Sequence, residues 1–286
     1  MPSLQQLRRR LKSISSIHQI TKAMEMIATS KMQKATQKCL LARDYSLSSK
    51  EILAHHQEQK HPLLAKKEIK NSYLIFATSD RGLCGGFNSS LFRELTNFLH
   101  NAQSENKTIL IITIGKKGSN FVKKFHPDKL LADFSDIKDE ISYEEITPIA
   151  HLVIGDFLSG KCDAVNILYS HFESSFSQKP TILTLLPVSY ETEGKPQEKL
   201  SDFLFEPSEK ELLDLLIPQF VEMQIYQTLL ESKASEYSAR MLAMKNATEN
   251  AKDLMDELYL TYHSIRQATI TAEICDLTVA KQTMEQ

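Results

Sequence analysis

The position of the helix-breaking residues constrains the fold of this chain most strongly. All glycines lie within Gly82–Gly194, and neither glycine nor proline occurs in Ser3–His61 or Gln219–Gln286. Inside a helix, proline costs about 3 kcal/mol and glycine about 1 kcal/mol relative to alanine. Two breaker-free ends around a breaker-rich middle predict a long helix, a globular region and a second long helix. At about 1.5 Å per residue, the final segment would reach roughly 100 Å.

Apolar residues in the C-terminal segment recur in alternating steps of four and three. This period of about 3.5 residues is typical of a coiled-coil seam and predicts a left-handed twist. Because the seam residues are small or medium-sized, the helix pair is expected to depend partly on its surroundings, and an ordinary antiparallel hairpin packed on a domain is the alternative. The seam comprises Tyr237, Met241, Met244, Thr248, Ala251, Met255, Leu258, Tyr262, Ile265, Thr269 and Ala272.

The seam of the N-terminal segment is less regular. It begins with Leu4, Leu7, Leu11 and Ile14, and the apolar residues then slip by one position to Ile17, Ile20, Met24 and Ile27. A strict register would instead place His18, Thr21 and Glu25 on the seam. The sequence therefore predicts local repacking in this part of the first helix.

The middle of the chain has the pattern of an α/β domain. Helix patterns at Ser90–His100, around Gly118–Phe125 and at Tyr143–Ser159 are interspersed among strand patterns, which predicts a mostly parallel sheet flanked by helices. No helix pattern separates the last two strands, so they are expected to form an antiparallel edge pair. The predicted strands are Tyr73–Thr78, Thr108–Ile114, Leu130–Phe134, Ala164–Tyr169 and Thr181–Leu186.

Charge and cysteine content exclude several classes of protein. The net charge is −2, but residues 1–50 carry +8 and residues 209–286 carry −6, which favours association of the two ends. The four cysteines have no metal-ligand or CxxC spacing, which indicates free thiols in a reducing compartment. No apolar run approaches the roughly 20 residues that span a bilayer. The basic start is typical of a transit peptide, but the helical pattern continues well beyond the usual length of one.

A glycine-rich motif, Ser79–Asn88 (SDRGLCGGFN), follows the first strand and precedes a helix. A nucleotide-binding fold places its phosphate loop there, although this motif is neither GxGxxG nor a Walker A sequence. A structural turn that permits close packing is the favoured interpretation, and a protein-binding surface is the other alternative.

Three further candidate functional sites have weaker support in the sequence. Cys84 is tied to no histidine or acid by a recognisable motif, so a nucleophilic role is not favoured. His55, His56 and His61 fit no standard zinc spacing, and a solvated helix end is the default interpretation. The basic cluster Arg8–Lys12 is compatible with nucleic acid, an anionic membrane or an acidic protein surface, and the pattern does not choose among them.

Four segments together resemble the signature segments of the F-type ATP synthase gamma subunit, of the bacterial type. They occur in the expected order across the whole chain, which makes the combination specific although each segment alone is weak. The segments are Gln19–Met26, Ser79–Asn88, Ala234–Thr248 and Arg266–Ile274.

The resemblance implies a fold and a set of partners. It implies an antiparallel coiled coil of the terminal helices plus a central Rossmann-like α/β domain, divided into residues 1–61, 62–207 and 208–286. The implied protein is a non-catalytic rotor of the proton-translocating complex, without cofactor or metal. The implied partners are the alpha, beta and epsilon subunits and the c-subunit ring, with no nucleic acid. Without a presequence, a bacterial protein on the inner face of the plasma membrane is expected.

The resemblance also assigns roles to individual residues. Contact with beta-subunit loops is implied for Lys22, Met24, Glu25, Arg240, Arg266 and Gln267. Contact between the foot of the rotor and the c ring is implied for Phe203, Phe205 and Glu206, and the glycine-rich turn of the foot is represented by Arg81, Gly82, Gly85 and Gly86. If Arg240 serves a partner, replacing it by alanine should leave the melting of the isolated chain unchanged.

A different class of protein fits the same pattern less well. It is a nucleotide- or small-molecule-binding α/β protein with an appended helical hairpin for dimerisation. Tight binding of ATP or NAD to the isolated chain would favour that class, whereas activation of an ATPase by assembly would favour the rotor.

Overall fold

The computed structural model describes residues 3–54, 61–65, 68–135, 137–138, 140–189 and 209–284, and for 44–54, 209–211 and 282–283 only the backbone path is described. Contacts divide the chain into two compact units. The first combines Met1–Ala28 with Met241–Gln286, and the second is Thr29–Arg240. The elements are α1 (Leu4–Ala54), η1 (Pro62–Leu64), β1 (Asn71–Ala77), α2 (Phe87–Ser104), β2 (Thr108–Ile114), α3 (Lys116–Phe125), η2 (Pro127–Lys129), β3 (Leu130–Phe134), η3 (Tyr143–Glu145), α4 (Thr147–Leu158), β4 (Ala164–Phe172), β5 (Gln178–Leu186) and α5 (Glu209–Met284).

The second unit contains a five-stranded sheet with the order β3-β2-β1-β4-β5. Strands β3, β2, β1 and β4 are parallel, and β5 pairs antiparallel with β4 at the edge. The mostly parallel sheet and the antiparallel edge pair are therefore both confirmed. Six of the seven residues of β1 are buried, as expected for a central strand covered on both faces.

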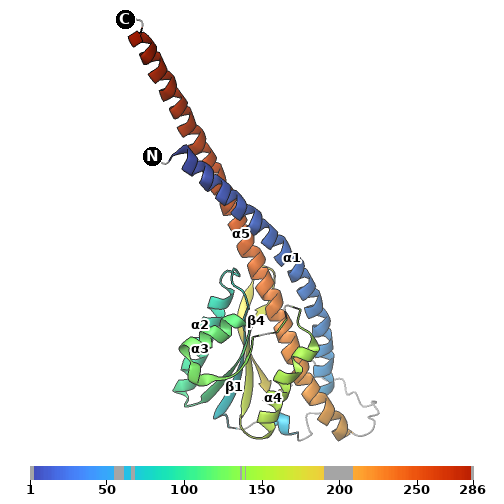
Figure 1. Cartoon of the computed structure of the whole chain (residues 1–286). Coiled ribbons are helices and arrows are strands. Elements are labelled where there is room, and N and C mark those ends of the chain that lie inside the picture. Colours follow the sequence, from blue (N-terminus) through green and yellow to red (C-terminus); the bar gives the residue numbers. More distant parts are fainter. Residues whose placement is uncertain are drawn as a thin grey trace. The chain divides into compact units, whose positions relative to one another are not determined.

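Helices cover both faces of the sheet (Figure 1). On one face, α2 and α3 contribute residues such as Leu91 and Val122 to a core with Leu74 and Ile111. On the other face, α4 and the first part of α5 pack against the sheet. That core includes Phe157 of α4 together with Ile217, Phe220, Val221 and Ile225 of α5, all nearly or fully buried.

The predicted helix over Tyr143–Ser159 is divided in two. Ser142 and Glu145 form a capping box around the short turn η3, and the α-helix α4 begins only at Thr147. Pro148 lies in the first turn of α4, where a helix has no need of its missing N–H donor. Pro218 lies inside α5, ahead of the breaker-free segment.

Helices α1 and α5 run antiparallel in the second unit. Ala35 of α1 packs with Ala234 and Tyr237 of α5, and further along α1 the pair Cys39 and Ala42 packs with Leu230, which lies earlier on α5. Small side chains at these contacts allow the two helix backbones to approach closely.

In the first unit, α1 and α5 also form a pair, and the strict register of the seam is retained. Thr248 Oγ1 donates to Thr21 Oγ1 at 3.0 Å, and Leu7 and Ala28 are only 2% exposed. The predicted slip is wrong, because Ile17, Ile20 and Ile27 are 48–59% exposed. The regular seam of α5 sets the register of the helix pair. The hydrogen bond between Thr21 and Thr248 satisfies the polar groups that this register places on the seam. Beyond Thr269 the residues of α5 whose burial is described are all exposed, including Ala272, the last predicted seam residue.

Candidate functional site

The glycine-rich motif forms a tight turn between β1 and α2. Leu83 and Gly85 have positive φ angles of 62° and 56°, a conformation that glycine adopts without a steric penalty. Asn88 holds the turn together. Its Nδ2 donates to Ser79 Oγ at 2.7 Å, and its Oδ1 accepts from the Ser79 N–H at 3.3 Å. Gly86 precedes the first residue of α2 as its N-cap.

The N-terminus of α3 is satisfied by oxygen atoms of the chain itself. Asp80 Oδ1 accepts from the Lys116 N–H at 3.1 Å, and Thr78 Oγ1 accepts from the Gly118 N–H at 2.8 Å. A helix N-terminus of this kind would otherwise offer its N–H groups to a phosphate. A β-carbon on Gly118 would lie 2.6 Å from Thr78 Oγ1, so glycine is required for this close approach. These contacts favour the structural interpretation of the turn over the phosphate loop.

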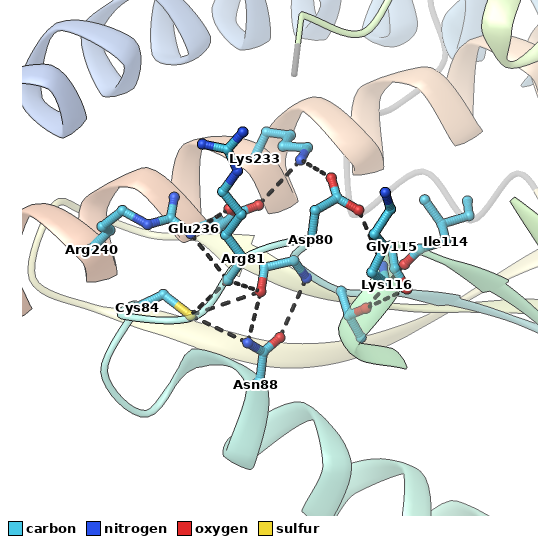
Figure 2. Close-up of polar contacts among 12 residues, drawn as sticks. Asp80, Arg81, Cys84, Asn88, Ile114, Gly115, Lys116, Lys233, Glu236 and Arg240 are labelled. Atoms are coloured by element: carbon cyan, nitrogen blue, oxygen red, sulfur yellow. Dashed lines mark hydrogen bonds and ion pairs between the residues drawn. The ribbon is translucent and has the colours of Figure 1, made fainter. Parts of the chain in front are cut away.

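Four charged side chains form an ionic network beside the turn: Asp80, Lys233, Glu236 and Arg240 (Figure 2). Lys233 Nζ lies 3.5 Å from Asp80 Oδ2 and 3.3 Å from Glu236 Oε2. Arg240 Nη2 donates to Glu236 Oε1 at 2.7 Å. The same nitrogen lies 3.3 Å and 3.4 Å from the carbonyl oxygens of Arg81 and Gly82.

The network is largely removed from solvent. The side chains of Lys233, Glu236 and Arg240 are 12%, 5% and 11% exposed. A charge this deeply buried is costly unless it is paired, so loss of one member leaves its partner in an unfavourable state. Spacings of three and four residues place the three side chains on one face of α5. That face meets the carboxyl end of the central strand β1, and open α/β sheets commonly bind ligands beyond the carboxyl ends of their strands.

The sequence predicts Arg81, Gly82 and Arg240 as site residues but not the residues that join them. Asp80, Lys233 and Glu236 were not identified as site residues. Lys233 and Glu236 do have a signal in the sequence. Together with Arg240 they form a row of alternating charges within a helical stretch otherwise rich in alanine and serine. Gly85 and Gly86 shape the turn and are not part of the network. The structure thus brings the predicted turn and Arg240 into one site.

A second polar cluster joins α5 to strand β4. Glu231 Oε2 lies 2.6 Å from His171 Nδ1, and Gln227 Nε2 donates to Glu231 Oε1 at 3.3 Å. Burial, followed by the negative charge of Glu231, raises the pKa of the Cys39 thiol to about 11. Burial and the same carboxylate also raise the pKa of Tyr169. Cys39 is therefore held as a neutral thiol, which does not favour reactivity.

The other residues predicted to contact the beta subunits or the c ring lie in parts of the sequence away from the ionic network. Lys22 and Glu25 form an ion pair at 3.1 Å on α1, and Met24 between them is half-buried. Arg266 and Gln267 are exposed on the last part of α5. The predicted c-ring contacts Phe203, Phe205 and Glu206 lie outside the described residues.

The described residues contain no cluster of three or more His, Cys, Asp or Glu side chains suited to a metal ion. Among them, no helix combines the length and apolarity required to cross a membrane. The four cysteines are free, with only Cys275 exposed. The fold and the site define a class of α/β protein whose terminal helices pair antiparallel. Its own charged side chains lie at the carboxyl end of the central strand, where open α/β sheets commonly bind ligands.

Comparison with known proteins identifies the family. The family model described as ATP synthase matches residues 3–283. The ATP synthase gamma chain of Pelotomaculum thermopropionicum is 42% identical, with 97% of each chain covered, and that of Desulfitobacterium hafniense is 39% identical, with 100% of each covered. The chain belongs to the family of ATP synthase gamma chains.

Solved structures agree with this assignment. The central stalk of Tetrahymena thermophila mitochondrial ATP synthase matches with a TM-score of 0.62 and 28% identity, covering 80% of this chain and 99% of that one. The rotor of Euglena gracilis mitochondrial ATP synthase matches with a TM-score of 0.66 and covers 93% of this chain and 98% of that one. At 22% identity, the Euglena match supports the fold alone.

Proposed function

We propose that this chain is the central-stalk rotor of a proton-translocating ATP synthase, a non-catalytic subunit that couples rotation of the c ring to changes in nucleotide affinity at the beta subunits. The observation that carries the proposal is the match to gamma chains over the full length of both sequences. The proposed partners are the alpha, beta and epsilon subunits and the c ring. The proposed location is the inner face of a bacterial plasma membrane, reached through the complex.

The last part of α5 supports a role inside a larger assembly. In the first unit, α5 continues beyond the N-terminus of α1 (Figure 1). Ile274, Leu277 and Val279 are 58–72% exposed in this extension. A run of exposed aliphatic side chains on one helix is typical of a surface that another protein covers. A ring of alpha and beta subunits around this helix would provide that cover.

The outer face of α1 offers a second surface for the same ring. Ile17, Ile20, Lys22 and Ile27 are exposed on this face, and Met24 and Glu25, which are partly buried, lie close to it in the sequence. We assign contact with a beta-subunit loop to Lys22, Met24 and Glu25, and to Arg266 and Gln267 on α5. Arg240 also bonds the glycine-rich turn, so any beta-subunit contact would use its remaining donors, since guanidinium has five. The proposed division of the chain remains a helix at residues 1–61, a foot domain at 62–207 and a helix at 208–286. Contact with the c ring is proposed for Phe203, Phe205 and Glu206.

Reconstitution tests the proposal directly. Alpha and beta subunits are assembled with and without this chain, and ATP hydrolysis is measured. A rotor should raise hydrolysis on assembly, while the isolated chain should show no turnover and no tight ATP binding by calorimetry. Tight binding of ATP or NAD by the isolated chain, with no effect on hydrolysis, would instead support the small-molecule-binding class.

The beta-subunit contact is tested by Met24→Lys in the complete complex. The added charge, placed beside Lys22, should impair ATP-driven proton pumping while the isolated chain still folds. Met26→Lys, at a position that is 58% exposed, is a control for a charge on the neighbouring surface. Unchanged proton pumping with Met24→Lys would remove this contact from the proposal.

A further inference from the structure

The contacts between α5 and the sheet domain are of two kinds. Between Leu213 and Leu229, α5 packs on the sheet and α4 mainly through apolar side chains. The polar exceptions in this stretch are Glu222, which contacts Tyr143 and His151, and Asp214, which lies 3.3 Å from His61. Apolar contact is not directional, and by itself it specifies position less strictly than hydrogen bonds do. From Glu231 to Arg240, directional polar contacts to the strand ends and the turn follow one another closely along the helix.

These polar contacts follow one another along α5. Glu231 bonds His171 of β4 at 2.6 Å, and Ser235 Oγ donates to the Ser170 carbonyl oxygen at 3.0 Å. The ionic network of Asp80, Lys233, Glu236 and Arg240 completes the series. It ends at Arg240, which is the last residue of the second unit, and α5 continues at Met241 as part of the first.

Glu236 is the centre of the ionic network. Its Oε2 pairs with Lys233 and its Oε1 accepts from Arg240, while Lys233 reaches Asp80 and Arg240 reaches the turn carbonyls. Asp80 in turn caps α3 through the Lys116 N–H. One buried carboxylate therefore connects α5 to the turn after β1 and, through Asp80, to the start of α3.

We infer that this ionic network is the contact that bears torque between the sheet domain and α5, and that Glu236 is its central positioning residue. The inference rests on the proposed rotor function. A rotor driven at its helix pair must pass torque to its foot domain, and α5 is continuous from one to the other. Directional bonds between buried charges resist rotation of the helix on the sheet, because each donor must lose its acceptor before the helix can turn.

The test uses the complete ATP synthase in inverted vesicles and measures proton pumping per ATP hydrolysed. Glu236→Gln preserves the shape of the side chain but removes its charge. ATP hydrolysis should continue, while pumping per ATP hydrolysed should fall several-fold. Asp80→Asn, which retains the Oδ1 acceptor for Lys116 but loses the charge that faces Lys233, should produce a smaller fall. It also serves as the test variant if Glu236→Gln does not assemble.

The matched control separates torque transfer from stability. Val153→Ala removes two methyl groups from a fully buried site of α4, away from the network, and lowers stability without changing any of its charges. Its pumping per ATP hydrolysed should equal that of the unmodified chain. An unchanged ratio in both network variants, or an equal fall with Val153→Ala, would overturn the inference. Failure of the unmodified chain to support hydrolysis would instead contradict the rotor proposal itself.

Discussion

Helix α5 passes through two very different environments within one continuous element. From Phe220 to Arg240, in the second unit, no residue is exposed, and the helix is surrounded by its own chain. From Lys245 to Met284, in the first unit, most residues whose burial is described are exposed, and less exposed side chains recur chiefly along the seam. The first stretch is stabilised by this chain alone, whereas the second presents a surface to be covered by others.

The largest difference between the two stretches is expected when isoleucine is replaced by alanine in each of them. Ile225→Ala empties a fully buried site against the sheet and should lower the free energy of unfolding by about 2–5 kcal/mol. Ile265→Ala, in the half-buried seam, should cost about 1 kcal/mol or less. The Ile265 side chain removes less apolar area from water than a fully buried one, so its loss lowers the free energy of unfolding less. Urea unfolding of the isolated chain measures both. Equal losses would show that the two stretches are equally well packed.

Arg240→Ala tests how much a charged contact contributes to the stability of the buried stretch. Glu236 would remain buried with Lys233 as its partner, so the variant should lose about 2–3 kcal/mol, at or just below the usual range for a broken buried pair. The sequence alone predicts unchanged melting for Arg240→Ala, because it assigns Arg240 to a partner contact. The bonds of Arg240 within the chain predict a loss of stability instead. Thermal unfolding of the isolated chain decides the matter, and Arg266→Ala on the exposed stretch is the control that should show no change.

A third prediction concerns pH and a carboxylate of the sheet domain. Burial opposes ionisation of Asp133, but hydrogen bonds from Lys123 Nζ and Ser119 Oγ, each at 2.6 Å, outweigh it and lower its pKa. A depressed folded-state pKa stabilises the fold above the unfolded value of about 3.9 and loses that effect as pH falls below it. Asp133→Asn should therefore cost about 1 kcal/mol at pH 7, because the pair is partly exposed. Denaturant unfolding should give a smaller difference below about pH 4.

The smallest effect is expected on the outer face of α1. Ile20→Gln should change the stability of the isolated chain by no more than about 0.5 kcal/mol, because the side chain is 59% exposed. Leu7→Gln, at a site that is 2% exposed, is the matched substitution on the seam and should be clearly destabilising. Were Ile20→Gln the more damaging of the two, the slipped register would be correct after all.

Much of the fold follows from residue patterns that act locally. The breaker-free ends predicted α1 and α5, and alternating strand and helix patterns predicted the parallel sheet with its antiparallel edge. The predicted slip in α1 is wrong because it rests on the hydrophobicity of Ile17, Ile20 and Ile27, which the fold leaves exposed. In the structure, the regular pattern of α5 fixes the pairing, and Thr21 meets Thr248 through a hydrogen bond. The register thus depended on the partner helix rather than on the hydrophobicity of α1.

The long helices, the order of the strands along the chain, the tight turn at Gly85 and the family resemblance all follow from the sequence, since each depends on neighbouring residues or on local motifs. In contrast, the folded chain is needed to see that Asp80 meets Lys233, and that Arg240 bonds the carbonyl oxygens of Arg81 and Gly82. Those contacts join residues more than 150 positions apart. Pairing over such separations follows from the packing of α5 on the sheet, and no local pattern of charge specifies which opposite charge will be nearest.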